Sequence, residues 1–358
     1  MRADEPIERD TPTATAPGRD AGTPATYTLV AALRPIDPPA ITRAPEVSVQ
    51  AIEGARKRLD PRLQIDLIPT RIRARLTGPG WLVPEGWELR GRADRYGHLL
   101  VEPSLAHYRV LPSGALRAWL GERRLDVAPT AMATAENRGD GPKRLGLKTR
   151  RVEVTSRSAK ATFELARVDG CADAGALLSR MLLELMGAPP STAIAQADEV
   201  PVRAELRWSS RGGLVFEGLA LSRRSDLGAA QLAVPPQNAA FTTDPVPREW
   251  AAIMLTAGEL ASMHTVAIEV GPQPLPPGDP RATLTLANAT DALRIAWIDG
   301  APAAWLAPRG KTDLSGLMRG KYQVEWRTFL GDEAEPPATT FAPGSSELGA
   351  ADAGSGAK

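Results

Sequence analysis

Cysteine and histidine are scarce in this sequence, which has one cysteine, Cys171, and three histidines among its 358 residues. A single thiol allows neither an intramolecular disulfide nor a thiolate metal cluster. A lone free cysteine is most often a small buried hydrophobic residue, and we interpret Cys171 in that way. The chain also lacks any run of the roughly 18 apolar residues that a membrane-spanning helix needs.

Familiar catalytic and phosphate-binding motifs are absent too. The sequence has no G-x-G-x-x-G, H-E-x-x-H or G-x-S-x-G pattern. Gly310-Lys311-Thr312 ends like a phosphate-binding loop, but Trp305 stands where that loop needs its first glycine. His98, His107 and Asp94 could form a metal or acid–base cluster, but no ligand spacing favours one, and we interpret both histidines as surface or turn residues. The sequence therefore predicts no catalytic residue, no metal site and no cofactor, and it favours a protein that is not an enzyme.

Proline and glycine are plentiful instead, with 33 and 32 residues. Because proline interrupts helices and both residues favour turns, this composition predicts many short segments. Residues 1–26 combine four prolines with polar and acidic side chains, so we expect a disordered tether there and a disordered tail at 345–358. No apolar signal core is visible near Met1. The expected location is the cell envelope, in the periplasm or at the surface, if a signal was removed from this chain, and otherwise the cytoplasm.

Alternation of apolar and polar residues dominates the chain after the tether. Residues 63–67 and 71–76 alternate with a period of two, which is typical of strands with one apolar face. Further strands are expected at 87–92, 98–102 and 107–111. Pro112-Ser113-Gly114 predicts a hairpin turn into a strand at 115–120, although the same residues would also suit a helix. Residues 129–148 are predicted to form a polar loop.

Helical patterns are few. One is expected near 46–59, and the clearest is at 174–186, where leucines and Met181 recur on one face after a possible cap at Asp173. Thr256 and Glu259 stand in the relation of a capping box and predict a short helix at 257–262. We therefore expect a mainly β fold with a minor α+β component.

The predicted domain plan has three ordered parts. A β-rich domain at 27–245 holds the helices near 46–59 and 174–186. A linker with the short helix follows at 246–280. A small β-sandwich-like module occupies 281–344, and its five aromatic residues are expected to form its core. These are Trp297, Trp305, Tyr322, Trp326 and Phe329.

The module at 281–344 resembles the PEGA-type β-module of bacterial envelope and surface proteins. The matching residues are Ile298-Asp299-Gly300, an aliphatic-Asp-Gly turn, and Leu317 to Val324, which fit the pattern L-x-x-G-x-Y-x-V. The Pro-Glu-Gly-Ala that gives the family its name is absent. The resemblance implies an extracytoplasmic, non-catalytic module and covers no residue of 27–245.

Basic residues gather in one part of the chain. The net charge is +1 overall, but residues 43–160 carry 23 basic and 13 acidic side chains. Arg71, Arg73 and Arg75 lie on one face of an expected strand, and with Arg90 and Arg92 they are the candidate anion-binding residues, since guanidinium forks suit phosphate and carboxylate. The simpler interpretation is a solvated strand face paired to Glu88 or Glu102.

Three functions remain open on this basis. The sequence favours a non-catalytic binding or scaffold protein of a bacterial cell envelope, with a protein or a cell-wall glycan as partner. The first alternative is an anion-binding protein for acidic glycan or, less favoured, nucleic acid, acting through 43–160. The second is an enzyme whose site is not legible from the sequence.

Overall fold

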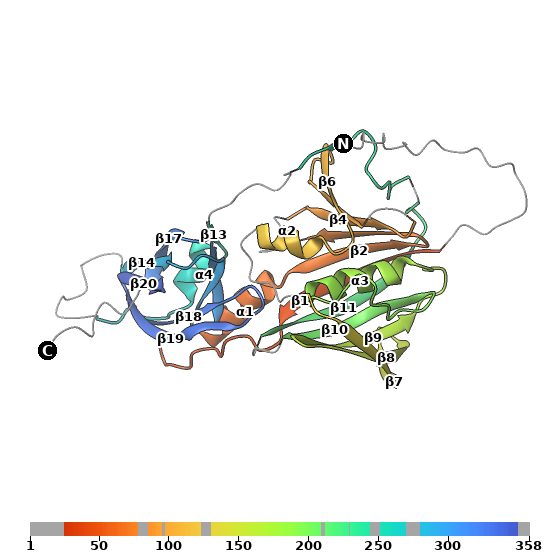
Figure 1. Cartoon of the computed structure of the whole chain (residues 1–358). Coiled ribbons are helices and arrows are strands. Elements are labelled where there is room, and N and C mark those ends of the chain that lie inside the picture. The colour runs from red at the N-terminus through yellow and green to blue at the C-terminus, as the bar shows by residue number, and fades with distance from the viewer. Residues whose placement is uncertain are drawn as a thin grey trace, which may run out of the picture.

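The computed structural model describes residues 25–77, 85–94, 97–122, 130–208, 212–228, 230–243, 251–269 and 280–349. Strands outnumber helices throughout these ranges, so the expectation of a mainly β fold with minor helices is confirmed. Two units lie side by side, a large sheet with two helices and a smaller β-sandwich (Figure 1). None of the helices in the described ranges is long and apolar enough to cross a membrane.

The large sheet has twelve strands, all antiparallel to their neighbours except the short pair β12–β6. In spatial order they are β12 (Ala240–Phe241), β6 (His107–Leu111), β5 (His98–Val101), β4 (Glu88–Arg92), β3 (Arg71–Leu76), β2 (Arg62–Ile68), β1 (Thr26–Pro35), β11 (Gly213–Arg224), β10 (Glu199–Trp208), β9 (Ala159–Arg167), β8 (Leu147–Ser156) and β7 (Ala133–Arg144). Helices α2 (Leu116–Glu122) and α3 (Ala174–Leu185) belong to the same unit.

Helix α3 lies within the curve of this sheet. It contacts β10 on one side and β2, β3 and β4 on the other, although β1 and β11 separate these strands in the sheet order. The sheet therefore curls around the helix (Figure 1). Most of the helix is buried, including Ser179 and Glu184, as expected for a helix covered on several sides. Asp173 is its N-cap residue but makes no side-chain capping bond.

Three segments differ from the sequence-based expectation. Residues 345–348, predicted to begin a disordered tail, belong to the strand β20 (Gly344–Leu348). Residues 1–24 of the predicted tether and residues 350–358 of the predicted tail lie outside the described residues. Residues 116–122 form the helix α2 instead of the predicted strand, because Leu116, Trp119 and Leu120 then all pack into the core. The predicted polar loop at 129–148 contains β7, an edge strand that pairs with β8 while its side chains stay mostly exposed. With no buried face, β7 carries no alternation by which a sequence pattern could reveal it.

The smaller unit packs a five-stranded sheet on a three-stranded one. The larger sheet consists of β13 (Ala251–Ile253), β16 (Ala301–Leu306), β15 (Arg294–Ile298), β18 (Gly320–Arg327) and β19 (Glu333–Ala342), in that order. The other consists of β17 (Lys311–Met318), β14 (Arg281–Asn288) and β20 (Gly344–Leu348). Asp299 and Gly300 form the predicted two-residue turn between β15 and β16, both with positive φ.

Two helices from other parts of the chain complete the core of the sandwich. Ile52 and Leu59 of α1 (Val49–Leu59) and Leu260 of α4 (Ala257–Ser262) belong to the same apolar cluster as the strands. The predicted capping box of Thr256 and Glu259 is present at the start of α4. Helix α1 follows β1 of the large sheet in sequence, yet its buried side chains pack into the smaller unit.

The aromatic residues of the smaller unit divide between two cores, which differs from the single core expected. Tyr322 and Trp326 lie between the two sheets of the sandwich. Trp297, Trp305 and Phe329 belong instead to the apolar cluster of the large sheet. The reason is that the five-stranded sheet buries both its faces, one inside the sandwich and one against the neighbouring unit.

Candidate functional site

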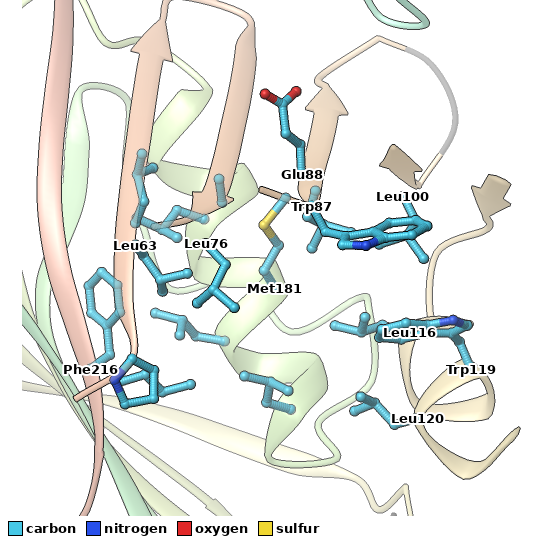
Figure 2. Close-up of a pocket in the computed structure, with 18 residues that line it drawn as sticks. Leu63, Leu76, Trp87, Glu88, Leu100, Leu116, Trp119, Leu120, Met181 and Phe216 are labelled. Carbon is cyan, nitrogen blue, oxygen red and sulfur yellow. The ribbon is translucent and has the colours of Figure 1, made fainter. Parts of the chain in front are cut away.

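An apolar cavity of about 130 Å³ lies between the curled sheet and the helices α2 and α3. Eighteen residues line it, and all except Glu88 are apolar (Figure 2). They are Leu33, Pro61, Leu63, Ile65, Ala74, Leu76, Trp87, Glu88, Leu89, Leu100, Leu116, Trp119, Leu120, Leu178, Met181, Leu182, Leu185 and Phe216. The Glu88 carboxylate points away from the labelled apolar side chains in Figure 2.

Strands β2, β3 and β4 form the floor of the cavity, and the alternation of side chains along them decides which residues line it. Ile65 of β2 pairs with Ala74 of β3, and Ala74 pairs with Leu89 of β4, so all three side chains point to the face that α3 covers. Ala74 is the smallest of the lining residues, and its short side chain leaves part of the space empty. Trp87 and Trp119 stand at the side, next to Leu100 and Leu116 (Figure 2).

The chemistry of this cavity is uniform. Because the lining side chains offer almost no polar partner, a water molecule inside would lose the hydrogen bonds it makes in bulk. An apolar cavity of roughly 150 Å³ stays dry in other proteins and takes a benzene ring or a xenon atom. The site is therefore suited to an apolar group of about that size, held by burial of its surface without directional bonds.

The opposite face of the same strands carries the arginines singled out in the sequence. Register pairs Arg71 with Arg92, Arg73 with Arg90, and Arg75 with Glu88, so the face of β3 that carries its three arginines continues onto β4 with Arg90 and Arg92. Each has an acceptor within the protein. Arg75 donates to Gln64, and Arg92 bonds Asp94 through two nitrogens.

The two acidic partners of this face are buried. Asp66 and Glu88 are 1% and 4% exposed. Arg73 donates to Asp66 through Nε at 2.9 Å, and Arg90 donates to Glu88 through Nε at 2.7 Å. Burial lowers the pKa of Arg90, and the charge of Glu88 opposes that effect. The expected pairing to Glu88 is thus present, whereas Glu102 bonds His107 and Ser104.

Backbone carbonyls supply the remaining acceptors of these arginines. Arg71 donates to Leu232, Arg90 to Ala233 and Arg92 to Val234, so three consecutive carbonyls lie against the arginine face. Val234 packs with Leu99, Val101 and Tyr108 in a small apolar cluster of its own. The arginines therefore hold a chain segment onto the sheet, and anion binding by Arg71, Arg73, Arg75, Arg90 and Arg92 stays a prediction.

The histidines considered as a cluster are not brought together. His98 is fully buried, against our interpretation of it as a surface or turn residue, because its ring lies against Glu184 of α3. Its Nε2 lies 3.5 Å from Oε1 of Glu184, too far for a good hydrogen bond. His107 is exposed at the other end of the β5–β6 pair and bonds Glu102, while Asp94 bonds Arg92. No group of three or more metal-ligating side chains occurs within the described residues.

Cys171 is fully buried, as expected. Burial raises its pKa to about 12, with the charge of Asp198 adding to the effect. The thiol is therefore protonated at neutral pH and is no nucleophile.

Sequence patterns did not reveal the cavity, for a physical reason. Its lining comes from Leu33 to Phe216 along the chain, and each contributing segment carries only the ordinary signal of a strand or helix with one buried face. The unusual feature is the space left between these faces, which depends on how they are placed in three dimensions.

Comparisons with known proteins give no family. No family model matches the sequence, and no curated protein matches it. Among solved structures, the chain is similar to PNGF-II in the C2 space group, with 8% identity and a TM-score of 0.32 over 76% of this chain. It spans 46% of the length of that protein.

Two further similar structures are complexes of MucB. One is MucB with MucA(peri), at 11% identity and a TM-score of 0.27, covering 88% of this chain and 86% of MucB. The other is the Pseudomonas aeruginosa MucA/MucB complex, at 13% identity and a TM-score of 0.28, covering 88% and 87%. Similarities this low establish no shared fold.

Proposed function

We propose that the protein is a non-catalytic binding protein that takes an apolar ligand, such as an acyl chain or a ring, into the cavity under α2 and α3. The supporting observation is the cavity of about 130 Å³, whose lining includes two tryptophans, Met181 and a single charged residue that turns away. Protein cores are close-packed and hold few voids larger than a water molecule, and ligand sites are mostly apolar concave spaces.

Placement in a bacterial cell envelope is part of the same proposal. It is supported by the PEGA-like sequence run at 281–344 and by the Asp299-Gly300 turn between β15 and β16. Subcellular fractionation of the organism that makes the protein tests this part, because recovery of the protein in the cytosol alone would contradict it.

Titration calorimetry with benzene, whose size matches the cavity, tests the ligand-binding part. We expect saturable binding at one site, next to Trp87 and Trp119, which line the cavity. Ala74→Phe fills the space from the strand floor and should weaken binding at least tenfold.

Ala338→Phe provides the matched control, since it adds the same ring to an exposed position of β19. Both variants must keep the far-UV spectrum of the parent protein. Equal affinity of the parent and Ala74→Phe would exclude the cavity as the binding site, and an absence of saturable binding to the parent would remove the proposed function.

A further inference from the structure

A second cavity of about 130 Å³ lies where the two units meet. Its walls come from the end of β1, from α1, from β15 and from the segment after β18, so both units contribute to it. Its lining differs from that of the first cavity because three arginines, Arg34, Arg56 and Arg327, and one carboxylate, that of Asp60, stand among mostly apolar residues.

The three arginines are not equally neutralised. Arg34 pairs with Asp60 at 2.7 Å and with Glu217 at 3.0 Å. Arg327 pairs with Glu325 at 2.6 Å. Arg56 donates only to the backbone carbonyls of Gly300 and Pro39, and no carboxylate of the described residues lies within ion-pair distance of it.

The environment of Arg56 disfavours its charge. Burial, and next the charge of Arg327, lower the pKa of Arg56, while the more distant Glu53 and Glu325 oppose the shift. An anion placed beside this guanidinium would relieve both effects, because it would supply the missing counter-charge in a partly desolvated site.

Aromatic side chains complete the cavity. The guanidinium carbon of Arg56 lies 5.8 Å from the ring centre of Trp297, and Phe329 lines the same space. Trp297 is 6% exposed, and its indole nitrogen has no hydrogen-bond acceptor in the part of the chain that the structure describes. The residues that line the cavity thus include a guanidinium with no carboxylate partner among the described residues, an indole whose N–H lacks an acceptor there, and ring surfaces, around a space close to that of a benzene ring.

We propose that this second cavity binds a small aromatic carboxylate, with its carboxylate at Arg56 and its ring against Trp297 and Phe329. The site exists only where the two units pack together, so its occupant also links them. The proposal is independent of the apolar-ligand function, since the two cavities have different linings apart from Pro61.

Calorimetric titration of the full chain with benzoate, and with its neutral analogue benzamide, tests the proposal. We expect benzoate to bind at least tenfold more tightly than benzamide. Arg56→Gln should weaken benzoate binding at least tenfold and leave benzamide unchanged, whereas Lys57→Gln, which removes an exposed charge from the next position of α1, should change neither. Ala74→Phe, in the first cavity, should also leave benzoate binding unchanged. Equal benzoate affinity of Arg56→Gln and the parent would overturn the proposal.

A measurement on the unmodified protein covers the case in which Arg56→Gln does not fold. With ¹⁵N-labelled tryptophan, the indole resonance of Trp297 is assigned by its loss in Trp297→Phe. This resonance should shift on addition of benzoate, and on addition of benzamide only at concentrations at least tenfold higher. If benzoate leaves the Trp297 resonance unchanged, the site is not where we place it.

Discussion

Arg90 shows how a single side chain can resemble a ligand-binding residue in the sequence and serve the fold in the structure. Its strand places Leu89 in the apolar cavity and Arg90 on the opposite face, 2% exposed and bonded to the buried Glu88. A pair of buried charges adds little net stability, but removal of one member leaves the other buried without a partner.

Arg90→Met should therefore destabilise the protein by about 3–5 kcal/mol, because it leaves the Glu88 carboxylate buried, with Arg73 at 4.0 Å as its remaining ion-pair partner among the described residues. The double variant Glu88→Met/Arg90→Met should recover a large part of that loss. Urea unfolding curves measure both effects through their midpoints. Arg75→Gln is the control. Arg75 lies on the same face and donates to the neutral Gln64, so this change should cost no more than about 1 kcal/mol. A stability of Arg90→Met equal to that of the parent would show that the pair is not structural.

At the scale of elements, α4 is joined to α1 by one carboxylate. The Glu259 carboxylate accepts hydrogen bonds from the backbone N–H and the hydroxyl of Thr256. It also accepts one from the guanidinium of Arg58 in α1. These bonds, the one from Arg58 first, lower its pKa from 4.5 to about 2. A group whose pKa is lower in the folded state stabilises the fold above its unfolded pKa and loses that effect as the pH falls towards the folded value.

Glu259→Gln should consequently lower the free energy of unfolding by about 1 kcal/mol at pH 7, allowing for partial solvent screening. The deficit should shrink as the pH falls from 4.5 towards 2, where the parent carboxylate is also protonated. Thermal unfolding across this pH range measures the difference. Glu347→Gln, an exposed carboxylate on β20, should show a change under about 0.5 kcal/mol throughout. A deficit that is the same at pH 7 and pH 3 would contradict this assignment.

The elements also show which parts of the fold could be predicted from the sequence. Predictions that rest on a few neighbouring residues are confirmed: the Thr256–Glu259 capping box, the Asp299-Gly300 turn and the apolar face of α3. α2 was assigned wrongly because the turn residues 112–114 also suit a hairpin, and burial in three dimensions decides between them. β7 was missed because its partner β8, and not its own pattern, makes it a strand.

At the scale of the whole molecule, the two units share their apolar cores. Trp297, Trp305 and Phe329 of the smaller unit belong to the cluster of the large sheet, while α1 carries the chain from the large sheet into the core of the smaller unit. Nothing in the linear pattern distinguishes a tryptophan that fills its own sandwich from one that packs on a neighbour. This is why the five aromatic residues were assigned to a single core.

Shared cores predict that the two units unfold together. Differential scanning calorimetry should show one transition, with a calorimetric enthalpy close to the van't Hoff enthalpy. Trp305→Ala removes a contact between the units and should lower the melting temperature of that single transition, or split it. Two separate transitions in the parent protein would contradict the shared core.

The central claim is that the space under α2 and α3 is an apolar binding cavity, and diffraction from crystals under xenon pressure tests it most directly. Xenon enters dry apolar cavities of this size and is located by its electron density. We predict a xenon atom between Trp87, Met181 and Leu182 in the parent protein, and none at that place in Ala74→Phe. Density for ordered water there, or side chains packed together so that no space remains, would contradict the account.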